Sequence, residues 1–163
     1  MSNGKLLSIG KSNATFKFNQ EVKKLNRQEW LRWRQTGIGG SDAPIILGLS
    51  PWSTPYKLYD EKSATEVKDN LPNFQQQRGI DMEPKIRALF ELMKGESFAA
   101  NFVQDDSFGR ASLDGESVCK KKILEIKYSG KDDYDIAKSG KVPDKYYAQC
   151  QHNLMVSKAE ICY

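Results

Sequence analysis

The sequence predicts an α/β fold in which a small mixed β-sheet is flanked by helices. One observation is a long stretch of helical spacing between residues 74 and 94, which ends at Gly95. A second is the change to strand-like alternation after this glycine, in three consecutive segments. The third is the return of a helical pattern over residues 144–156, followed by the strand-like AEICY. Helices, a three-strand meander, a helix and a strand form the layers of an α/β domain.

Composition limits the classes of protein to which the chain can belong. With 163 residues, of which 39% are hydrophobic and 28% charged, it has the length and composition of one folded domain. The net charge of +4 is compatible with a nucleic-acid partner but does not require one. No apolar run reaches the roughly 18 residues of a membrane span. We therefore expect no membrane partner and a cytoplasmic location.

The histidine and cysteine content excludes several kinds of chemistry. His152 is the single histidine, too few for HExxH metalloproteases or for nucleases built on paired histidines. Cys119, Cys150 and Cys162 lack CxxC spacing and suggest neither a disulfide framework nor a zinc site. We expect free thiols in a reducing compartment, and a chemistry that uses carboxylates, lysines and a metal ion.

The chain divides into a short extension and one domain. Residues 1–24 are expected to form a partly ordered N-terminal extension, in which an alternating patch at 14–18 could be an edge strand. Residues 25–163 are expected to form the domain. Its first helix, RQEWLRWRQ, follows Asn26, a residue type that caps helices, and ends at Gly37.

The rest of the domain is predicted from turn residues and apolar spacing. A short helix begins at Ser41 and stops at Gly48, and a second short helix follows the prolines of SPWSTPYKLYDEKS. The polar stretch 129–141 is predicted to be a loop, and Pro143 opens the last helix. The chain stops within AEICY, so either this strand is very short or the sequence continues. The three strands of the meander are SFAANFVQ, GRASLDG and KKILEIKY.

The motifs SLDG at 112–115 and LEIK at 124–127 contain the residues best suited to chemistry. Side chains alternate between the two faces of a strand, so Glu125 and Lys127 are expected to share one face. Asp114 ends the preceding strand, and a hairpin turn would bring it beside Glu125. Two carboxylates that converge in this way form an oxygen site suited to Mg²⁺.

Lys127 completes the set of groups that hydrolysis of a phosphodiester needs. A divalent cation lowers the pKa of a water molecule and polarises the phosphate, while a neighbouring ammonium group can orient that water and contact a phosphate oxygen. Asp114, Glu125 and Lys127 on adjacent strands match the PD-(D/E)xK nuclease pattern. The alternative is a surface ion pair between Glu125 and Lys127 with no catalytic role.

Three further blocks contain residues that could extend this site. Glu83 lies beside the apolar stripe of its helix and could reach the sheet directly or through water; otherwise it is a solvated glutamate. Arg34 and Ser41 flank the glycines of GIGG, which could cradle a phosphate or simply form a tight connection. Gln149 and Gln151 in the last helix could hold a water molecule or a phosphate oxygen.

Together, and in this order, the four blocks resemble the phage lambda exonuclease family, also called the YqaJ-like viral recombinases, from about residue 25 to the last residue. The resemblance implies a restriction-endonuclease-like core. It implies that Arg34 and Ser41, in RQTGIGGS, bind the 5′-phosphate of a DNA end. The implied catalytic residues are Glu83, Asp114, Glu125, Lys127 and Gln149, and the implied metal ligands are Asp114, Glu125, the backbone carbonyl of Ile126 and, directly or through water, Glu83.

The same resemblance implies a Mg²⁺-dependent 5′→3′ exonuclease, with Mn²⁺ as a substitute, that degrades one strand of linear double-stranded DNA. The remaining 3′ single strand would serve a single-strand-annealing protein in phage-type recombination. Characterised members form a ring-shaped trimer, so a homo-oligomer is implied if the chain is complete. The sequence has Leu113 where the motif has a proline, and family members usually continue beyond AEICY, which would make this domain truncated at its C-terminus.

Two other functions are compatible with the sequence. An endonuclease of the same fold would cut closed circular DNA, whereas an exonuclease that depends on a 5′-phosphate would leave circles intact. A truncated, non-catalytic module that binds DNA or protein would keep the fold and lose the reaction. Cleavage of a linear duplex with Mg²⁺ separates this module from both enzymes.

Overall fold

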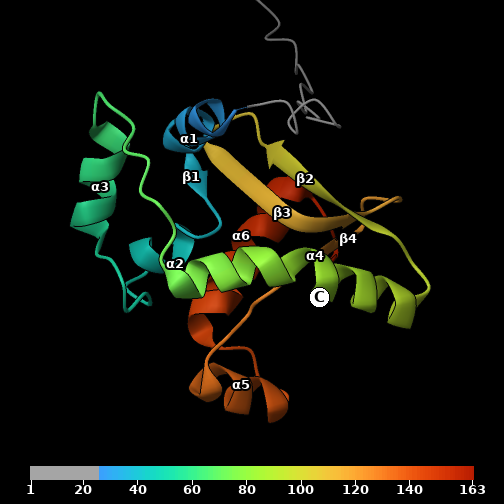
Figure 1. Cartoon of the computed structure of the whole chain (residues 1–163). Coiled ribbons are helices and arrows are strands. Elements are labelled where there is room, and N and C mark those ends of the chain that lie inside the picture. Colours follow the sequence, from blue (N-terminus) through green and yellow to red (C-terminus); the bar gives the residue numbers. More distant parts are fainter. Residues whose placement is uncertain (1–25) are drawn as a thin grey trace, which may run out of the picture.

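The structure is a computed structural model that describes residues 26–163, so the expected extension 1–24 and its strand at 14–18 lie outside the described residues. A five-stranded mixed sheet is flanked by helices (Figure 1), which confirms the predicted α/β class. The elements in chain order are α1 (Arg27–Gln35), β1 (Ile38–Gly39), α2 (Ala43–Ile46), α3 (Pro55–Ser63), α4 (Phe74–Lys94), β2 (Phe98–Gln104), β3 (Gly109–Ser117), β4 (Lys122–Leu124), α5 (Lys131–Lys138), α6 (Asp144–Ser157) and β5 (Ile161–Cys162).

The sheet is built around β3. On one edge, β2 pairs antiparallel with β3 along almost its whole length, from Gln104 opposite Arg110 to Phe98 opposite Ser117. On the other edge, β1 pairs parallel with the start of β3, and β4 pairs antiparallel with its end. β5 then adds to β4 in parallel. Asp114 therefore lies in the part of β3 between the segments that pair with β1 and with β4.

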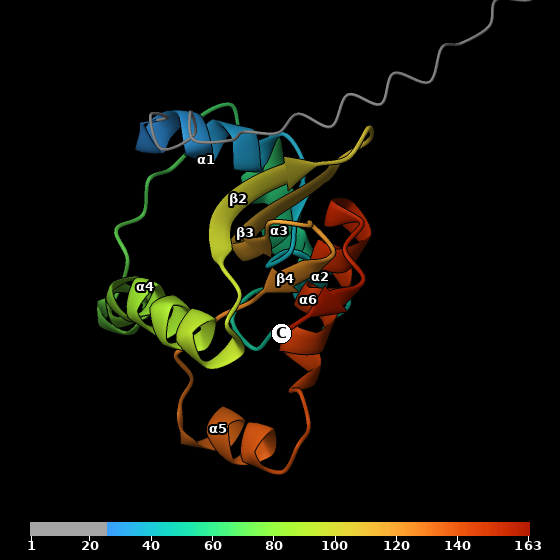
Figure 2. The ribbon, with the colours of Figure 1, turned by 90° about the vertical axis from the view of Figure 1, so that its right-hand side faces the viewer.

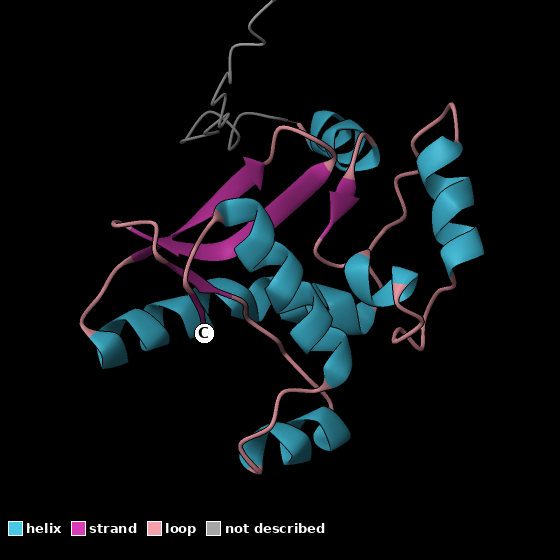
Figure 3. Cartoon of the chain, turned by 180° about the vertical axis from the view of Figure 1, so that it is seen from behind, coloured by secondary structure: helices cyan, strands magenta, loops and turns pink. Residues whose placement is uncertain are grey.

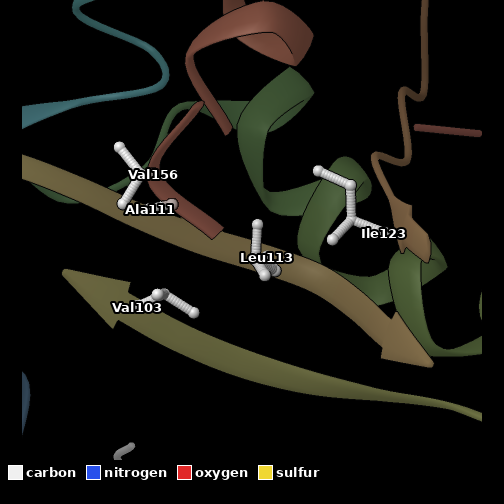
Figure 4. Close-up of a cluster of buried hydrophobic side chains, with 5 residues drawn as sticks. All are labelled: Val103, Ala111, Leu113, Ile123 and Val156. Atoms are coloured by element: carbon white, nitrogen blue, oxygen red, sulfur yellow. The ribbon is translucent and has the colours of Figure 1, made fainter. Parts of the chain in front are cut away.

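Helices α4 and α6 lie on opposite sides of the sheet, as Figure 2 shows. From behind, α6 runs from the end near α5 up to the sheet (Figure 3). The hydrophobic core lies where the sheet packs against α6, and burying a branched aliphatic side chain there stabilises the fold by about 1.5–3 kcal/mol. Its buried members are Val103, Ala111, Leu113, Ile123 and Val156 (Figure 4).

Helix α4 has the bounds that the sequence predicts. Asn73 caps its start through a reciprocal pair of hydrogen bonds with Gln76, and Gly95 ends it in the left-handed conformation at φ 65°. Phe90 of α4 packs against Phe98 and Tyr163, with ring centroids 5.5 and 5.4 Å away. These contacts fix the helix against the sheet. No helix within residues 26–163 has the length and apolar character that crossing a membrane requires.

Two predictions about the second half of the chain are wrong. The polar stretch 129–141 is not a loop throughout, because α5 occupies much of it; acidic residues in its first turn and Lys138 in its last turn favour a polar helix through the helix dipole. The strand predicted for KKILEIKY is shorter, since β4 ends at Leu124. Beyond it, the N–H of Glu125 donates to the carbonyl of Tyr163 and the N–H of Ile126 donates to the Asp114 carboxylate, so neither continues the pairing with β3.

Candidate active site

Asp114 and Glu125 lie at the point where the chain leaves β4. Leu124 is paired with Gly115, and the N–H of Ile126 donates a hydrogen bond to Asp114 Oδ2 at 2.6 Å. Glu125 is therefore held between two residues that are tied to β3. Burial of the Asp114 side chain and the charge of Glu125 raise the pKa of Asp114 to about 7. Two desolvated carboxylates at one place favour a bound proton or cation.

Glu125 is bound through both of its oxygen atoms, and its side chain is only 5% exposed. Oε1 accepts a hydrogen bond from Gln149 Nε2 at 2.7 Å and lies 2.5 Å from Lys127 Nζ. Oε2 accepts a hydrogen bond from Asn153 Nδ2 at 2.9 Å. Burial raises the pKa of Glu125, although the Lys127 charge opposes that shift. Gln149 thus contacts the carboxylate, whereas Gln151 is exposed, and the predicted contact of these glutamines with water or a phosphate oxygen stays a prediction.

Lys127 lies between the carboxylate and an aromatic ring. Its Nζ lies 5.3 Å from the centroid of the Tyr146 ring on α6, a distance at which the ring face attracts a cation. The Tyr146 hydroxyl donates a hydrogen bond to Asp133 of α5 at 2.8 Å. Burial and the acceptor Asp133 both raise the pKa of Tyr146, so the hydroxyl stays a donor. Sequence reasoning missed Tyr146, because a tyrosine in a helix gives no signal of its own.

Glu83 lies near Asp114, but its carboxylate is hydrogen-bonded to another residue of α4. Its carboxylate pairs with Arg87, one turn further along α4, at 2.5 Å. Its charge is close enough to raise the pKa of Asp114, after the larger effects of burial and Glu125. The structure therefore brings Glu83 to the edge of the site, with Arg87 as its direct partner.

Arg34 and Ser41, the predicted phosphate-binding residues, are in contact. Arg34 Nη2 donates a hydrogen bond to Ser41 Oγ at 2.9 Å, and the guanidinium stacks 4.8 Å from the Trp30 ring centroid. Both side chains reach the surface. The helix predicted to start at Ser41 begins instead at Ala43 and has four residues, so its dipole adds little to the attraction for an anion.

Lys62 of α3 organises the loop that carries Ser41. Its Nζ donates hydrogen bonds to the carbonyl oxygens of Arg34 and Gly37, both at 2.8 Å, and pairs with the buried Asp42 at 2.6 Å. Asp42 in turn accepts a hydrogen bond from the N–H of Gly39 at 2.7 Å. Sequence reasoning missed Lys62, since no local pattern links a lysine to a loop more than twenty residues away.

The glycines of this loop allow close packing. A Cβ atom at Gly37 would collide with the carbonyl oxygen of Phe108, and one at Gly40 would collide with Asn153 Oδ1. Close packing therefore explains both glycines. This agrees with the alternative interpretation of the loop as a tight connection and does not require a phosphate cradle. Binding of a phosphate at this loop would depend mainly on the side chains of Arg34 and Ser41.

The donor set fits a hard divalent cation. Within residues 26–163, no group of three or more His, Cys, Asp or Glu side chains is arranged to hold a metal ion. Mg²⁺ usually takes only one or two protein carboxylates and keeps several waters. Asp114 and Glu125 supply that number, and burial is the main reason that both have a raised pKa. These are the residues that could hold such an ion.

A family model and a protein from Bacillus subtilis match this chain. The family model described as "YqaJ-like viral recombinase domain" matches residues 29–160. The protein called "Uncharacterized protein YqaJ" from Bacillus subtilis (strain 168) is 31% identical over 137 residues. That match covers 82% of this chain and 43% of the Bacillus subtilis protein, so the chain spans less than half the length of this relative.

Solved structures of an exonuclease have a similar fold. The crystal structure of LHK-Exo in complex with dAMP matches with a TM-score of 0.70, and that of the alkaline exonuclease LHK-Exo from Laribacter hongkongensis with a TM-score of 0.69. Each match is 21% identical and covers 82% of this chain and 70% of the other. At this identity the likeness establishes the fold, and it confirms the predicted mixed sheet flanked by helices.

Proposed function

Because the chain belongs to the family of YqaJ-like viral recombinase domains, we propose that it acts as a Mg²⁺-dependent 5′→3′ exonuclease on the ends of linear double-stranded DNA. Removal of nucleotides from one strand would leave a 3′ single strand for an annealing protein. The complex of LHK-Exo with dAMP supports a nucleic-acid substrate. Assembly into a ring-shaped homo-oligomer and the annealing partner remain predictions from the family resemblance.

The observation that carries this proposal is the grouping of Asp114, Glu125 and Lys127. Two carboxylates are withdrawn from water beside the ammonium group of Lys127, whose side chain is 32% exposed. A purely structural ion pair would not need the second carboxylate, whose burial beside Glu125 is unfavourable. Such an arrangement is typical of a functional site, at which a divalent cation offsets the repulsion between the two carboxylates.

Each residue has a role that its contacts support. Asp114 and Glu125 would hold the divalent cation, which when bound lowers the pKa of a water molecule and polarises a phosphate oxygen. Lys127 would orient the attacking water and donate to the phosphate oxygen on which negative charge develops. Gln149 keeps the Glu125 carboxylate in its orientation through the hydrogen bond to Oε1. Glu83 would add negative charge at the edge of the site.

The contact between Arg34 and Ser41 supports recognition of a terminal phosphate. A guanidinium that already donates to a hydroxyl and stacks on Trp30 is held ready to bind a phosphate through two N–H groups. This pocket would place the end of the strand next to the carboxylates. We therefore propose that the enzyme prefers a 5′-phosphorylated end over a 5′-hydroxyl end.

Incubation of the protein with Mg²⁺ and 5′-phosphorylated linear duplex DNA tests the proposal. We expect shortening of the 5′ strand, which chelation of Mg²⁺ stops. Chelation with later return of Mg²⁺ is the control, because it restores activity only if the protein stays folded. Retention of DNA binding with no cleavage in Mg²⁺ or Mn²⁺ would instead support a non-catalytic binding module.

A further inference from the structure

We infer that Asn153 is a positioning residue that fixes Glu125 relative to the loop of Ser41, and so sets the distance between the end-phosphate pocket and the carboxylate pair. This inference rests on the proposed exonuclease function. It concerns a residue that the family motifs quoted above do not include. Three features of Asn153 support it: its burial, the direction of its amide and the close approach of Gly40.

Asn153 lies on α6 and is only 1% exposed. Its Nδ2 donates the hydrogen bond to Glu125 Oε2, at 2.9 Å. A carboxylate can only accept, so the NH₂ group must face Glu125, and Oδ1 must point elsewhere. Oε1 of Glu125 is already bound by Gln149 and Lys127. Within the described chain, Asn153 is thus the residue that restrains the second oxygen.

The opposite side of the same amide touches the loop of the phosphate pocket. Oδ1 lies so close to Gly40 that a Cβ atom there would collide with it. Ser41 follows directly and accepts the hydrogen bond from Arg34. One buried side chain therefore spans from the Ser41 loop to Glu125.

The unpaired oxygen indicates that this amide is not there for packing alone. Asn153 Oδ1 is buried and has no hydrogen-bond partner among residues 26–163. An apolar side chain of similar size would fill the space without leaving a buried acceptor unpaired. The polar contact that Asn153 does make is to Glu125, so a role in orienting this carboxylate explains its presence in the core.

The test compares cleavage of 5′-phosphorylated and 5′-hydroxyl linear duplexes by the full chain carrying Asn153→Ala or Asn153→Leu. Because both substrates are incubated with the same protein sample, the ratio of the two rates does not depend on the fraction of protein that is folded. We expect the rate on the phosphorylated end to fall by about tenfold or more, since a hydrogen bond to a charged group is lost. The preference for the phosphorylated end should fall as well. Met155→Ala, at an exposed position of the same helix, is the control and should change neither value.

Gly40→Ala changes the contact between the loop and Asn153 from the side of the loop. Its added methyl group must displace the Asn153 amide, so we expect the same loss of rate and of preference. In the double variant with Asn153→Ala the collision disappears, and its rate should be no lower than that of Asn153→Ala alone.

The outcomes separate the two proposals. If the wild-type protein prefers phosphorylated ends and both Asn153 variants keep its rate and preference, the inference is wrong and the exonuclease proposal stands. If the Asn153 variants lose rate but keep the wild-type preference, the proposed link to the phosphate pocket is wrong. A wild-type protein that cleaves no linear duplex overturns the exonuclease proposal itself, and this inference with it.

Discussion

The ammonium group of Lys127 lies 2.5 Å from the carboxylate of Glu125, just beyond the end of β4. The two partners differ in exposure, since 32% of the Lys127 side chain and 5% of the Glu125 side chain are accessible. Lys127 therefore lies on the solvent side of a buried carboxylate. Replacing Lys127 distinguishes a role in the reaction from a role in stabilising the fold, because the two roles predict different effects on cleavage and on DNA binding.

Replacing Lys127 with alanine is expected to abolish most cleavage while DNA binding largely persists. Its ammonium is proposed to act on the phosphate in the reaction, whereas binding draws on several phosphate contacts. A reduction in cleavage rate of about a hundredfold or more corresponds to the loss of one well-placed stabilising group. Cleavage and binding are measured separately, with Lys121→Ala, an exposed lysine paired with Glu160, as the control. An equal loss of both activities would contradict the proposed role.

Asp114→Asn should change how stability depends on pH. The pKa of Asp114 is raised to about 7 from its ordinary value of 3.8, so the folded protein keeps a proton that the unfolded chain releases between these values. The free energy of unfolding of the metal-free wild type should therefore fall as pH rises through this window, by up to about 4 kcal/mol. The asparagine variant should show a smaller fall, because only Glu125, whose pKa is also raised by burial, still contributes to it, and the variant should gain less stability from Mg²⁺ at higher pH.

Thermal unfolding on either side of this pH window, with and without Mg²⁺, measures both effects. Gln77→Ala, which removes an exposed partner of Asp81 on α4, is a control that leaves the site intact. Identical pH profiles for Asp114→Asn and the wild type would contradict the raised pKa of Asp114.

Arg34→Ala is expected to remove the preference for a phosphorylated end. The variant loses the guanidinium proposed to bind the terminal phosphate, so the rate on a 5′-phosphorylated duplex should fall by about tenfold or more, to the rate on a 5′-hydroxyl duplex. Arg27→Ala, on the same helix and paired with Asp69 at the surface, should keep the preference. A preference that survives in Arg34→Ala would mean that the phosphate binds elsewhere.

Lys62→Ala should destabilise the protein, because it leaves the buried carboxylate of Asp42 without its cation. Removing one partner of a buried ion pair costs about 3–5 kcal/mol. The double variant Lys62→Met with Asp42→Asn should lose less, since no charge is left unpaired. Urea unfolding measures these losses, and Lys57→Ala, at an exposed position of the same helix, should cost little. A Lys62→Ala protein as stable as the wild type would refute this account of the loop.

The helices with strong local signals could be predicted from the sequence. Asn26 and Asn73 cap α1 and α4 through hydrogen bonds within the first turn, and Gly95 ends α4 in a conformation that glycine favours. Such signals act over a few residues and are visible in any window of sequence. Helix α5 was missed because it is short and polar, is stabilised by charges at its ends and has no buried residue.

The surroundings of the candidate site depend on contacts between distant segments. The early end of β4 follows from the hydrogen bond that Ile126 donates to the side chain of Asp114. Neither Lys62 nor Asn153 could be found from spacing, because the partners of each lie twenty or more residues away. The sequence motifs did identify which carboxylates and which lysine would be neighbours, but their catalytic roles remain predictions.

Cleavage of two DNA substrates by the wild-type protein tests the central claim most directly. The substrates are a 5′-phosphorylated linear duplex and the same sequence as a closed circle, each incubated with Mg²⁺. We expect the linear duplex to lose nucleotides from its 5′ ends and the circle to remain intact, with Lys127→Ala inactive on both. Equal cleavage of the circle would contradict an exonuclease, and an intact linear duplex would contradict a nuclease built on Asp114, Glu125 and Lys127.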